Sequence, residues 1–313
     1  MNKGIKTGQQ KLILGYRKQE LKKFTPVYLM MLPGIALVFI FSYLPMMGIV
    51  ISFMDYDLIK GFESDWVGFA NFADLFAIPS FGKSIFNTLH ISFLGLLISF
   101  PAPIVLALLL NEVRAKVFKR TVQTVSYMPY FLSWIAVVGI STSLFSIYGI
   151  VNDVRVALFG ENTERIMFLA QQDFFVPNVI LTSVWKNVGW NTIIYLAAVT
   201  SIDPSLYEAA TIDGAGKFKQ CIHITIPCIS ETIIILLVMQ IGSMFNDNFD
   251  LIYGLQNPFI DFDVISTKIY KEGITQGAYD LATALGLFQG VLGLVLVSLA
   301  NYTSKKINGY SIW

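Results

Sequence analysis

Long apolar stretches separated by short polar segments run along this chain of 313 residues. A helix needs about 20 consecutive, mostly apolar residues to cross the hydrocarbon core of a bilayer. The stretches that reach this length are 27–54, 85–111, 121–147, 177–202, 228–247 and 282–302. The pattern therefore predicts an all-α polytopic membrane protein with six transmembrane helices in one membrane domain, 27–302.

The predicted membrane domain lies between two polar tails, 1–26 and 303–313. A cleavable signal peptide has an apolar core of only about 7–15 residues, so the long stretch that begins at Val27 is expected to remain as a span. Proline is tolerated inside membrane helices where neighbouring helices or water satisfy the freed carbonyls. We therefore expect kinked helices at Pro33, Pro45, Pro101, Pro103 and Pro129.

Composition favours the same class of protein. The chain is 55% hydrophobic and 14% charged, with a mean hydropathy of +0.62. Soluble domains carry about 25% charged residues, so this chain has too little charge to cover a water-facing surface. Its two cysteines, Cys221 and Cys228, cannot build a secreted disulfide scaffold and are predicted to be reduced.

The distribution of lysine and arginine predicts the orientation. Of the 22 such residues, seven lie in the N-terminal tail, four in the loop at 112–120, two in the loop at 203–226 and two in the C-terminal tail. The three alternate loops hold six, and Lys186 lies within a span. By the positive-inside rule, both termini and the two richer loops are cytoplasmic. The basic N-terminal tail would also be attracted to anionic membrane lipid.

The predicted cytoplasmic loop at 203–227 has the pattern of two short helices around a glycine turn. Pro204 and Ser205 can open the first helix, and Gly214 permits the positive φ that ends a helix. Apolar residues of the second segment share one face, and Pro227 is expected to end that helix before the membrane. The loop is therefore predicted to be a small helical knob that projects from the bilayer.

The same loop carries a family pattern. The run consists of Glu208-Ala209-Ala210, then Asp213-Gly214-Ala215 and, after a short helix, Ile224-Thr225-Ile226-Pro227. It resembles the EAA loop of binding-protein-dependent ABC importer permeases, most closely those of the maltose and glycerol-phosphate class. Cys221 and Ile226 depart from the aromatic residue and the leucine common in that family. Weaker matches follow in the family order at 66–72, 86–88, 128–130 and 149–152.

The resemblance implies a type I ABC importer permease fold in a bacterial cytoplasmic membrane, with the loop as a coupling helix. The implied partners are a second homologous permease, two ATPase subunits and an extracytoplasmic substrate-binding protein. ATP and Mg would bind to the ATPase subunits, so this chain is expected to be no enzyme and to bind no cofactor. The residues implied in ATPase coupling are Glu208, Ala209, Ala210, Asp213, Gly214, Ala215 and Pro227.

The segment from Gly214 to Lys217 has a superficial likeness to a phosphate-binding loop. A P-loop needs glycine and serine or threonine where this chain has Thr211 and Phe218. No nucleotide cradle is specified, so ATP hydrolysis is predicted to belong to a partner. The sequence also shows no metal-ligand spacing, no nucleophile–base pair and no nucleic-acid-binding pattern.

Polar side chains inside spans usually face the bundle interior or a water-filled cavity. In the fourth predicted span, four residues fall close to one helical face: Ser183, Asn187, Trp190 and Asn191. Amides and hydroxyls beside aromatic rings suit a neutral sugar. The substrate-pathway residues implied by the maltose branch are Tyr130, Trp134, Ser183, Asn187, Trp190, Met244 and Asn248. The alternative is that the tryptophans lie at the membrane interfaces and the amides tie helices together.

Charged residues at two places admit two interpretations each. Lys186, inside the fourth span, is expected either to snorkel outward or to pair with Asp247 across the pore. Acidic residues of the first and last outer loops are either solvated surface or a dock for a binding protein with basic patches. These residues are Asp55, Asp57, Glu63, Asp65 and Asp74 in the first loop, and Asp247, Asp250, Asp261, Asp263, Glu272 and Asp280 in the last.

Together these features predict a permease subunit that forms half of the pore of a sugar importer, with an oligosaccharide as cargo. The competing class is a secondary transporter or channel driven by an ion gradient. That class is expected to carry a carboxylate within a span, or inverted repeats with broken helices, whereas the clear intramembrane charge here is a lysine. A membrane scaffold is a third possibility, which leaves the polar faces of spans three to five unexplained.

Overall fold

The computed structural model describes residues 23–309, so most of the basic N-terminal tail and the last residues of the C-terminal tail lie outside it. The first described helix runs over Lys23–Phe53 and closes with a π turn, η1 (Phe39–Tyr43), and a 3-10 segment, η2 (Leu44–Phe53). The α-helices that follow are α2 (Ala70–Ala77), α3 (Pro79–Ile98), α4 (Pro101–Glu112), α5 (Lys116–Tyr127), α6 (Trp134–Leu144), α7 (Ile150–Phe159), α8 (Gln172–Thr200), α9 (Pro204–Ile212), α10 (Lys217–Gln220), α11 (Ile226–Cys228), α12 (Ser230–Gly242), α13 (Phe249–Leu255), α14 (Ile265–Tyr270) and α15 (Tyr279–Asn308). Shorter 3-10 and π segments are η3 (Gly61–Glu63), η4 (Met128–Phe131), η5 (Phe168–Ala170), η6 (Cys221–Thr225) and η7 (Lys271–Thr275).

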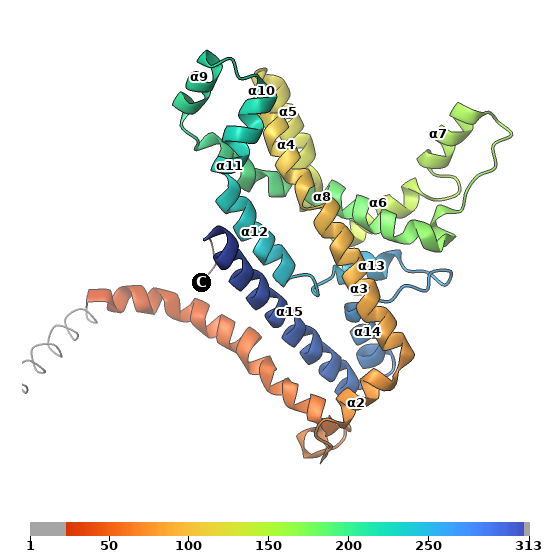
Figure 1. Cartoon of the computed structure of the whole chain (residues 1–313). Helices are drawn as coiled ribbons and strands as arrows, with labels where there is room; N and C mark the ends of the chain where they lie inside the picture. The colour runs from red at the N-terminus through yellow and green to blue at the C-terminus, as the bar shows by residue number, and fades with distance from the viewer. Residues whose placement is uncertain (1–22, 310–313) are drawn as a thin grey trace, which may run out of the picture.

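Each predicted span coincides with a helix or with a bent pair of helices. Three helical stretches are long and apolar enough to cross a membrane as they stand: Lys23–Phe53, Pro79–Glu112 and Tyr279–Lys306. Two bent pairs pass the same test of length and composition. The fourth predicted span is α8, which has 29 residues and a buried polar set that includes Lys186. These helices form an elongated bundle from which α6 and α7 extend sideways (Figure 1).

The third predicted span, 121–147, is not one straight helix. The segment Lys116–Phe131 meets Trp134–Leu144 at an angle of 107°. Pro129 lies in the 3-10 turn before the break, and a proline removes a backbone donor and crowds the preceding turn. Leu132 and Ser133 are extended, and Ser133 then caps α6 by accepting a hydrogen bond from the amide of Ala136.

The fifth predicted span, 228–247, also differs from the structure. Its straight part is α12, which ends at Gly242, and it is bent by 63° from the helical stretch Lys217–Cys228. The prediction that Pro227 ends the preceding helix is confirmed to within one residue, because the helical stretch stops at Cys228 and the bend follows. The π turn at Cys221–Thr225 comes directly before this proline, where a wider turn accommodates a missing N–H.

Buried apolar residues form two clusters. One joins α3, α8, α13 and the loop after α13 through Ile91, Phe175, Val176, Val179, Ile180, Leu251, Ile252, Leu255, Ile260, Phe262 and Val264. The other joins α2, α3, α14 and α15 around Leu75, Phe81, Phe245, Ile265, Ala284 and Leu285. The most apolar window of the first helix is not buried at all within this chain. That helix therefore presents its apolar surface to lipid or to another subunit.

The connection after the first helix is held by one asparagine. Strand β1 (Met54–Asp55) pairs antiparallel with β2 (Asp65–Trp66), with Met54 opposite Trp66. The side-chain amide of Asn71, in α2, donates to the carbonyls of Ser52 at 3.1 Å and Met54 at 2.8 Å. This buried side chain fixes α2 against the end of the first helix.

Candidate functional site

The loop at 203–227 folds as two helical arms around a glycine, as the pattern predicts. It projects at the same end of the bundle as the turn between α4 and α5 (Figure 1). The carboxylate of Asp203 accepts a hydrogen bond from the amide of Ser205 at 2.9 Å, which caps α9 and holds the pKa of Asp203 below its usual value. Gly214 follows α9 with φ +76°, in the left-handed region that favours glycine.

Internal hydrogen bonds make this loop a compact unit. The side-chain amide of Gln220 donates to Thr211 Oγ1 at 2.9 Å and to the carbonyl of Ala215 at 3.0 Å, so the two arms are tied across the turn. Lys217 forms an ion pair with Glu112 at the end of α4, with 3.3 Å between nitrogen and oxygen. The loop is therefore attached both to α8, through 201–203, and to the neighbouring turn.

The predicted coupling residues lie mostly on the outside of this unit. Exposed members are Glu208, Ala209, Asp213, Gly214 and Pro227, while Ala210 and Ala215 are half-buried. Within residues 23–309 Glu208 takes part in no ion pair. A small-residue surface with an unpaired carboxylate can receive a partner without first breaking a contact inside this chain.

A cavity lined by both apolar and polar side chains lies between the α3–α4 junction, α8 and α12. Its volume is about 430 Å³. The polar side chains that line it are Ser99, Ser183, Asn187, Asn191, Tyr195, Gln240 and Ser243. Two of the predicted pathway residues, Ser183 and Asn187, therefore share one cavity, and Asn187 donates to the carbonyl of Ser183 at 3.0 Å.

A second cavity of about 170 Å³ shares Ser99, Ser183, Gln240 and Ser243 with the first. Its lining also contains Met244 and Asn248, two more of the predicted pathway residues. The side chain of Asn248 accepts from the amide of Leu251 at 3.2 Å and so caps α13 as well. Four of the seven predicted pathway residues thus line two adjoining cavities.

The three aromatic pathway residues lie apart from these cavities. Tyr130 and Trp190 are stacked, with ring centroids 4.5 Å apart and planes within 4° of each other. Both rings remain accessible, at 36% and 40% exposure. Trp134 is packed against the larger apolar cluster at the start of α6. The structure therefore brings Tyr130 and Trp190 together as an open aromatic platform and makes Trp134 part of the packing.

Both predictions for Lys186 are wrong. Its side chain is 4% exposed, and its ammonium donates to the carbonyls of Tyr130 at 2.7 Å and Leu132 at 2.6 Å. Asp247 has a different partner, since the hydroxyl of Ser266 donates to its carboxylate. Lys186 thus neither reaches water nor pairs with Asp247, because carbonyl oxygens at the break in the third span accept hydrogen bonds from its ammonium.

Sequence reasoning missed the contribution of the second span to the cavity. Ser99, Phe100 and Pro103 line it at the junction of α3 and α4. The available signal was the proline pair, Pro101 and Pro103, which opens the backbone just after Ser99. A proline-induced break inside a span tends to coincide with a cavity, because unpaired carbonyls need water or polar partners.

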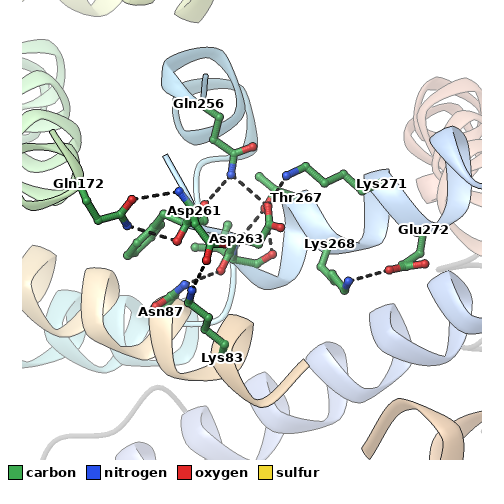
Figure 2. A network of polar contacts seen from close by, with 12 residues as sticks. Lys83, Asn87, Gln172, Gln256, Asp261, Asp263, Thr267, Lys268, Lys271 and Glu272 are labelled. Atoms are coloured by element: carbon green, nitrogen blue, oxygen red, sulfur yellow. Dashed lines mark hydrogen bonds and ion pairs between the residues drawn. The ribbon is translucent and has the colours of Figure 1, made fainter. Parts of the chain in front are cut away.

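Acidic residues of the last loop form a network of polar contacts with neighbouring helices (Figure 2). Asp261 pairs with Lys83 of α3 at 2.5 Å, and Asp263 pairs with Lys271 at 2.6 Å. Gln172, at the start of α8, exchanges hydrogen bonds with the backbone of Asp261 at 2.9 and 3.2 Å. The loop between α13 and α14 therefore joins α3 to α8, and these two carboxylates are engaged inside the chain.

Asp263 is expected to make stability depend on acid pH. Burial raises its pKa, but the hydrogen bond and charge of Lys271, with hydrogen bonds from Gln256 and Thr267, outweigh burial and hold the pKa below its usual value. A carboxyl group whose pKa is lowered by folding stabilises the folded state at pH values above its pKa in the unfolded chain. This stabilisation is lost as the pH falls below about 4. Asp263→Asn should lower the melting temperature by about 2–4 °C at pH 7, and the difference from wild type should shrink below pH 4. Thermal unfolding across pH measures this, with Asp65→Asn, in an exposed pair with Lys60, as the control.

Comparison of the sequence with known proteins identifies a family and several similar permeases. Residues 99–309 match the family described as binding-protein-dependent transport system inner membrane component. The protein LplB of Bacillus subtilis is 46% identical over 292 residues, which cover 92% of this chain and 91% of LplB. The polygalacturonan/rhamnogalacturonan transport system permease protein YteP of the same organism is 44% identical over 290 residues, covering 92% of this chain and 90% of YteP.

Solved structures extend the agreement to the fold. A chain of a bacterial ABC transporter involved in the import of the acidic polysaccharide alginate superposes with a TM-score of 0.85 and 39% identity, covering 94% of this chain and 99% of that one. The alginate transporter in complex with its alginate pentasaccharide-bound periplasmic protein gives a TM-score of 0.86 at the same identity and coverage. The chain has the type I importer permease fold, and it belongs to the binding-protein-dependent transport system inner membrane component family, the permeases of ABC importers.

Proposed function

We propose that this chain forms half of the pore of an ATP-driven importer and that the cargo is an oligosaccharide. The observation that carries the proposal is the path of α8. This helix lines the cavity of about 430 Å³ with Ser183 and Asn187 and is separated from the coupling helix α9 only by residues 201–203. A rise of about 1.5 Å per residue places Asn187 about 20 Å from the coupling end, so a displacement of α9 acts directly on the cavity wall.

The coupling loop supports separate ATPase subunits as partners. Its exposed small residues and Glu208 form a surface that a partner cleft can take up, and ATP and Mg would bind within that partner. Closure of the ATPase subunits would favour one of two arrangements of the bundle, and the work of transport comes from that difference in stability. This chain then needs no catalytic residue of its own.

The cavity chemistry supports a sugar as cargo. Ser183, Asn187 and Gln240 offer hydroxyl and amide groups to sugar hydroxyls. Outside the cavities, the exposed part of the Tyr130–Trp190 stack offers aromatic surface to the apolar side of a pyranose. The named transport systems of similar proteins, for polygalacturonan/rhamnogalacturonan and alginate, carry polysaccharides.

The arrangement in the membrane follows from charge and from exposed apolar surface. The lysine and arginine distribution favours a cytoplasmic location for the coupling loop and for both termini. A substrate-binding protein would then dock at the opposite end, beside α2 and the last loop. The unburied first helix fits contact with a second, homologous permease or with lipid.

Asn187→Leu is expected to raise the KM of binding-protein-dependent uptake about tenfold, because a cargo hydroxyl would lose its amide partner in the cavity. Uptake is measured in proteoliposomes that contain the complex with its ATPase subunits. Thr303→Val, on the exposed face of α15, is the matched loss of a polar group outside the cavity and should leave KM unchanged. Unchanged KM in Asn187→Leu would contradict the assignment of the cavity.

Co-purification separates the proposal from the gradient-driven alternative. An ATPase subunit that remains bound to this chain, together with uptake that requires ATP, supports the importer. Uptake by this chain alone, driven by an ion gradient, would overturn it.

A further inference from the structure

One buried cation in the bundle has no anionic partner. Lys186 lies in the middle of α8 and is 4% exposed, and among residues 23–309 it forms no ion pair. A charged side chain at such a position is costly unless its donors are satisfied. The structure must therefore supply another group for this ammonium.

That group is the broken end of a helix. Lys186 Nζ donates to the carbonyls of Tyr130 at 2.7 Å and Leu132 at 2.6 Å, and it lies 3.4 Å from that of Pro129. The carbonyls of Pro129 and Tyr130 belong to the last turn before the 107° bend, and that of Leu132 lies in the break itself. Carbonyls at a helix end lack partners within the helix and carry negative partial charge, although that of Pro129 also accepts from the amide of Leu132 at 3.2 Å. A lysine in α8 thus caps a helix end in the third span.

Two rings complete the site. The ammonium lies 5.4 Å from the ring centroid of Tyr130 and 4.9 Å from that of Trp134, both within the range of a cation–π contact. Trp134 begins α6, on the far side of the break, while Pro129 and Tyr130 precede it. One side chain of α8 therefore holds both arms of the bend.

The same contact sets the position of the aromatic platform. The carbonyl of Tyr130 accepts from Lys186, and the ring of Tyr130 stacks on Trp190, four residues and about one helical turn beyond Lys186 in α8. Backbone and ring of Tyr130 are thus attached to two points of the same helix. A movement of α8 would carry Tyr130 with it.

We infer that Lys186 is a positioning residue that clamps the break in the third span to α8, so that the Tyr130–Trp190 platform moves as one body with the helix that leads to the coupling loop. The inference rests on the proposed function for the platform and the loop. The clamp itself rests on distances within this chain alone. Without it, the bend would keep Pro129 and the hydrogen bond from Ser141 in α6 to Asn178 in α8, but it would lose the donors at the break itself.

The test measures the distance between the two clamped helices. Spin labels at Ile135 in α6 and Leu181 in α8, both exposed, are introduced after Cys221 and Cys228 are replaced by serine. The assembled importer in nanodiscs is compared without nucleotide and trapped with ATP and vanadate. Wild-type Lys186 should give one narrow distance distribution that is the same in both states, because α6 follows α8.

Lys186→Met should broaden this distribution at least twofold, because methionine fits the space but donates no hydrogen bond. Lys186→Arg keeps cationic N–H donors and should restore a narrow distribution, which a loss of packing alone would not explain. Lys60→Met, in an exposed pair of the outer loop, controls for the loss of a positive charge. If the methionine variant does not assemble, Lys186→Gln, with two donors on a shorter side chain, takes its place and should broaden the distribution less.

A distribution in Lys186→Met as narrow as in wild type would overturn the clamp, as would equal broadening by Lys186→Arg. These outcomes test the clamp independently of the proposed function. If ATP moves no part of the wild-type complex, the coupling proposal fails, while broadening by Lys186→Met without nucleotide still supports the clamp.

Discussion

An importer that carries Glu208→Lys together with Gly214→Pro should lose transport-coupled ATP hydrolysis down to the background rate, while the chain still inserts into the membrane. Gly214 has φ +76°, whereas proline is restricted to about −65°, so the turn between α9 and α10 cannot keep its shape. Glu208→Lys reverses the charge on the exposed face of α9. Both changes lie in the loop outside the spans, and insertion depends on the apolar spans.

Two single substitutions separate turn geometry from the mere loss of a glycine. Gly214→Ala introduces a Cβ at positive φ, which costs about 1–2 kcal/mol, and should reduce coupled ATPase activity partially. Gly216→Ala, in the same loop at φ −71° with open space around it, should leave activity unchanged. ATPase activity is measured with the substrate-loaded binding protein present. Coupling that survives the double substitution would show that the loop at 203–227 does not transmit the motion.

Gly189→Ala is expected to prevent tight packing of α8 against α5 and to reduce the yield of assembled complex severely. A Cβ at this position would overlap the carbonyl oxygen of Ser126 and lie 2.8 Å from the amide nitrogen of Tyr127. Both obstacles are backbone, which cannot move aside by a rotamer change. Overpacking in a core costs about 1–3 kcal/mol of stability. Because the clash is with backbone atoms, we expect Gly189→Ala to cost at least the upper value of this range.

The matched control is Gly290→Ala in α15, where an added Cβ meets nothing within 4 Å. It should keep the melting temperature and yield of wild type, since it places alanine in a helix without a clash and alanine favours helix over glycine. Size-exclusion chromatography and thermal unfolding of the purified complex compare the two variants. Equal yields would mean that α5 and α8 do not approach as closely as the structure places them.

Local patterns were enough to predict the elements that a membrane or a turn dictates. Six spans are predicted from the length of apolar sequence that a bilayer requires. Three helical stretches and two bent pairs have the length and composition of spans, and the fourth predicted span overlaps α8. The knob at 203–227 follows from short-range rules: Asp203 caps α9, and Gly214 adopts positive φ after it. Pro227 ends the second arm of the knob to within one residue, since the helix stops at Cys228.

Helical periodicity was enough to predict two of the four pathway residues that line the cavities. Ser183 and Asn187 are four residues apart in α8 and face the same cavity, because the spacing of one helical turn is a property of the sequence. Gln240 and Ser243 join them only through the packing of α12 against α8. Ser99 had no periodic signal, since its exposure to the cavity depends on the break that Pro101 introduces.

The sequence by itself determined that the chain is a helical membrane protein with a projecting helical loop, because bilayer thickness, charge bias and turn chemistry act on neighbouring residues. Tertiary structure alone decided the angle of the break in the third span, the shape of the cavities and the partner of Lys186. That lysine meets carbonyls 54 to 57 positions earlier in the chain. Contacts between residues so far apart depend on how complete helices pack, which no local pattern records.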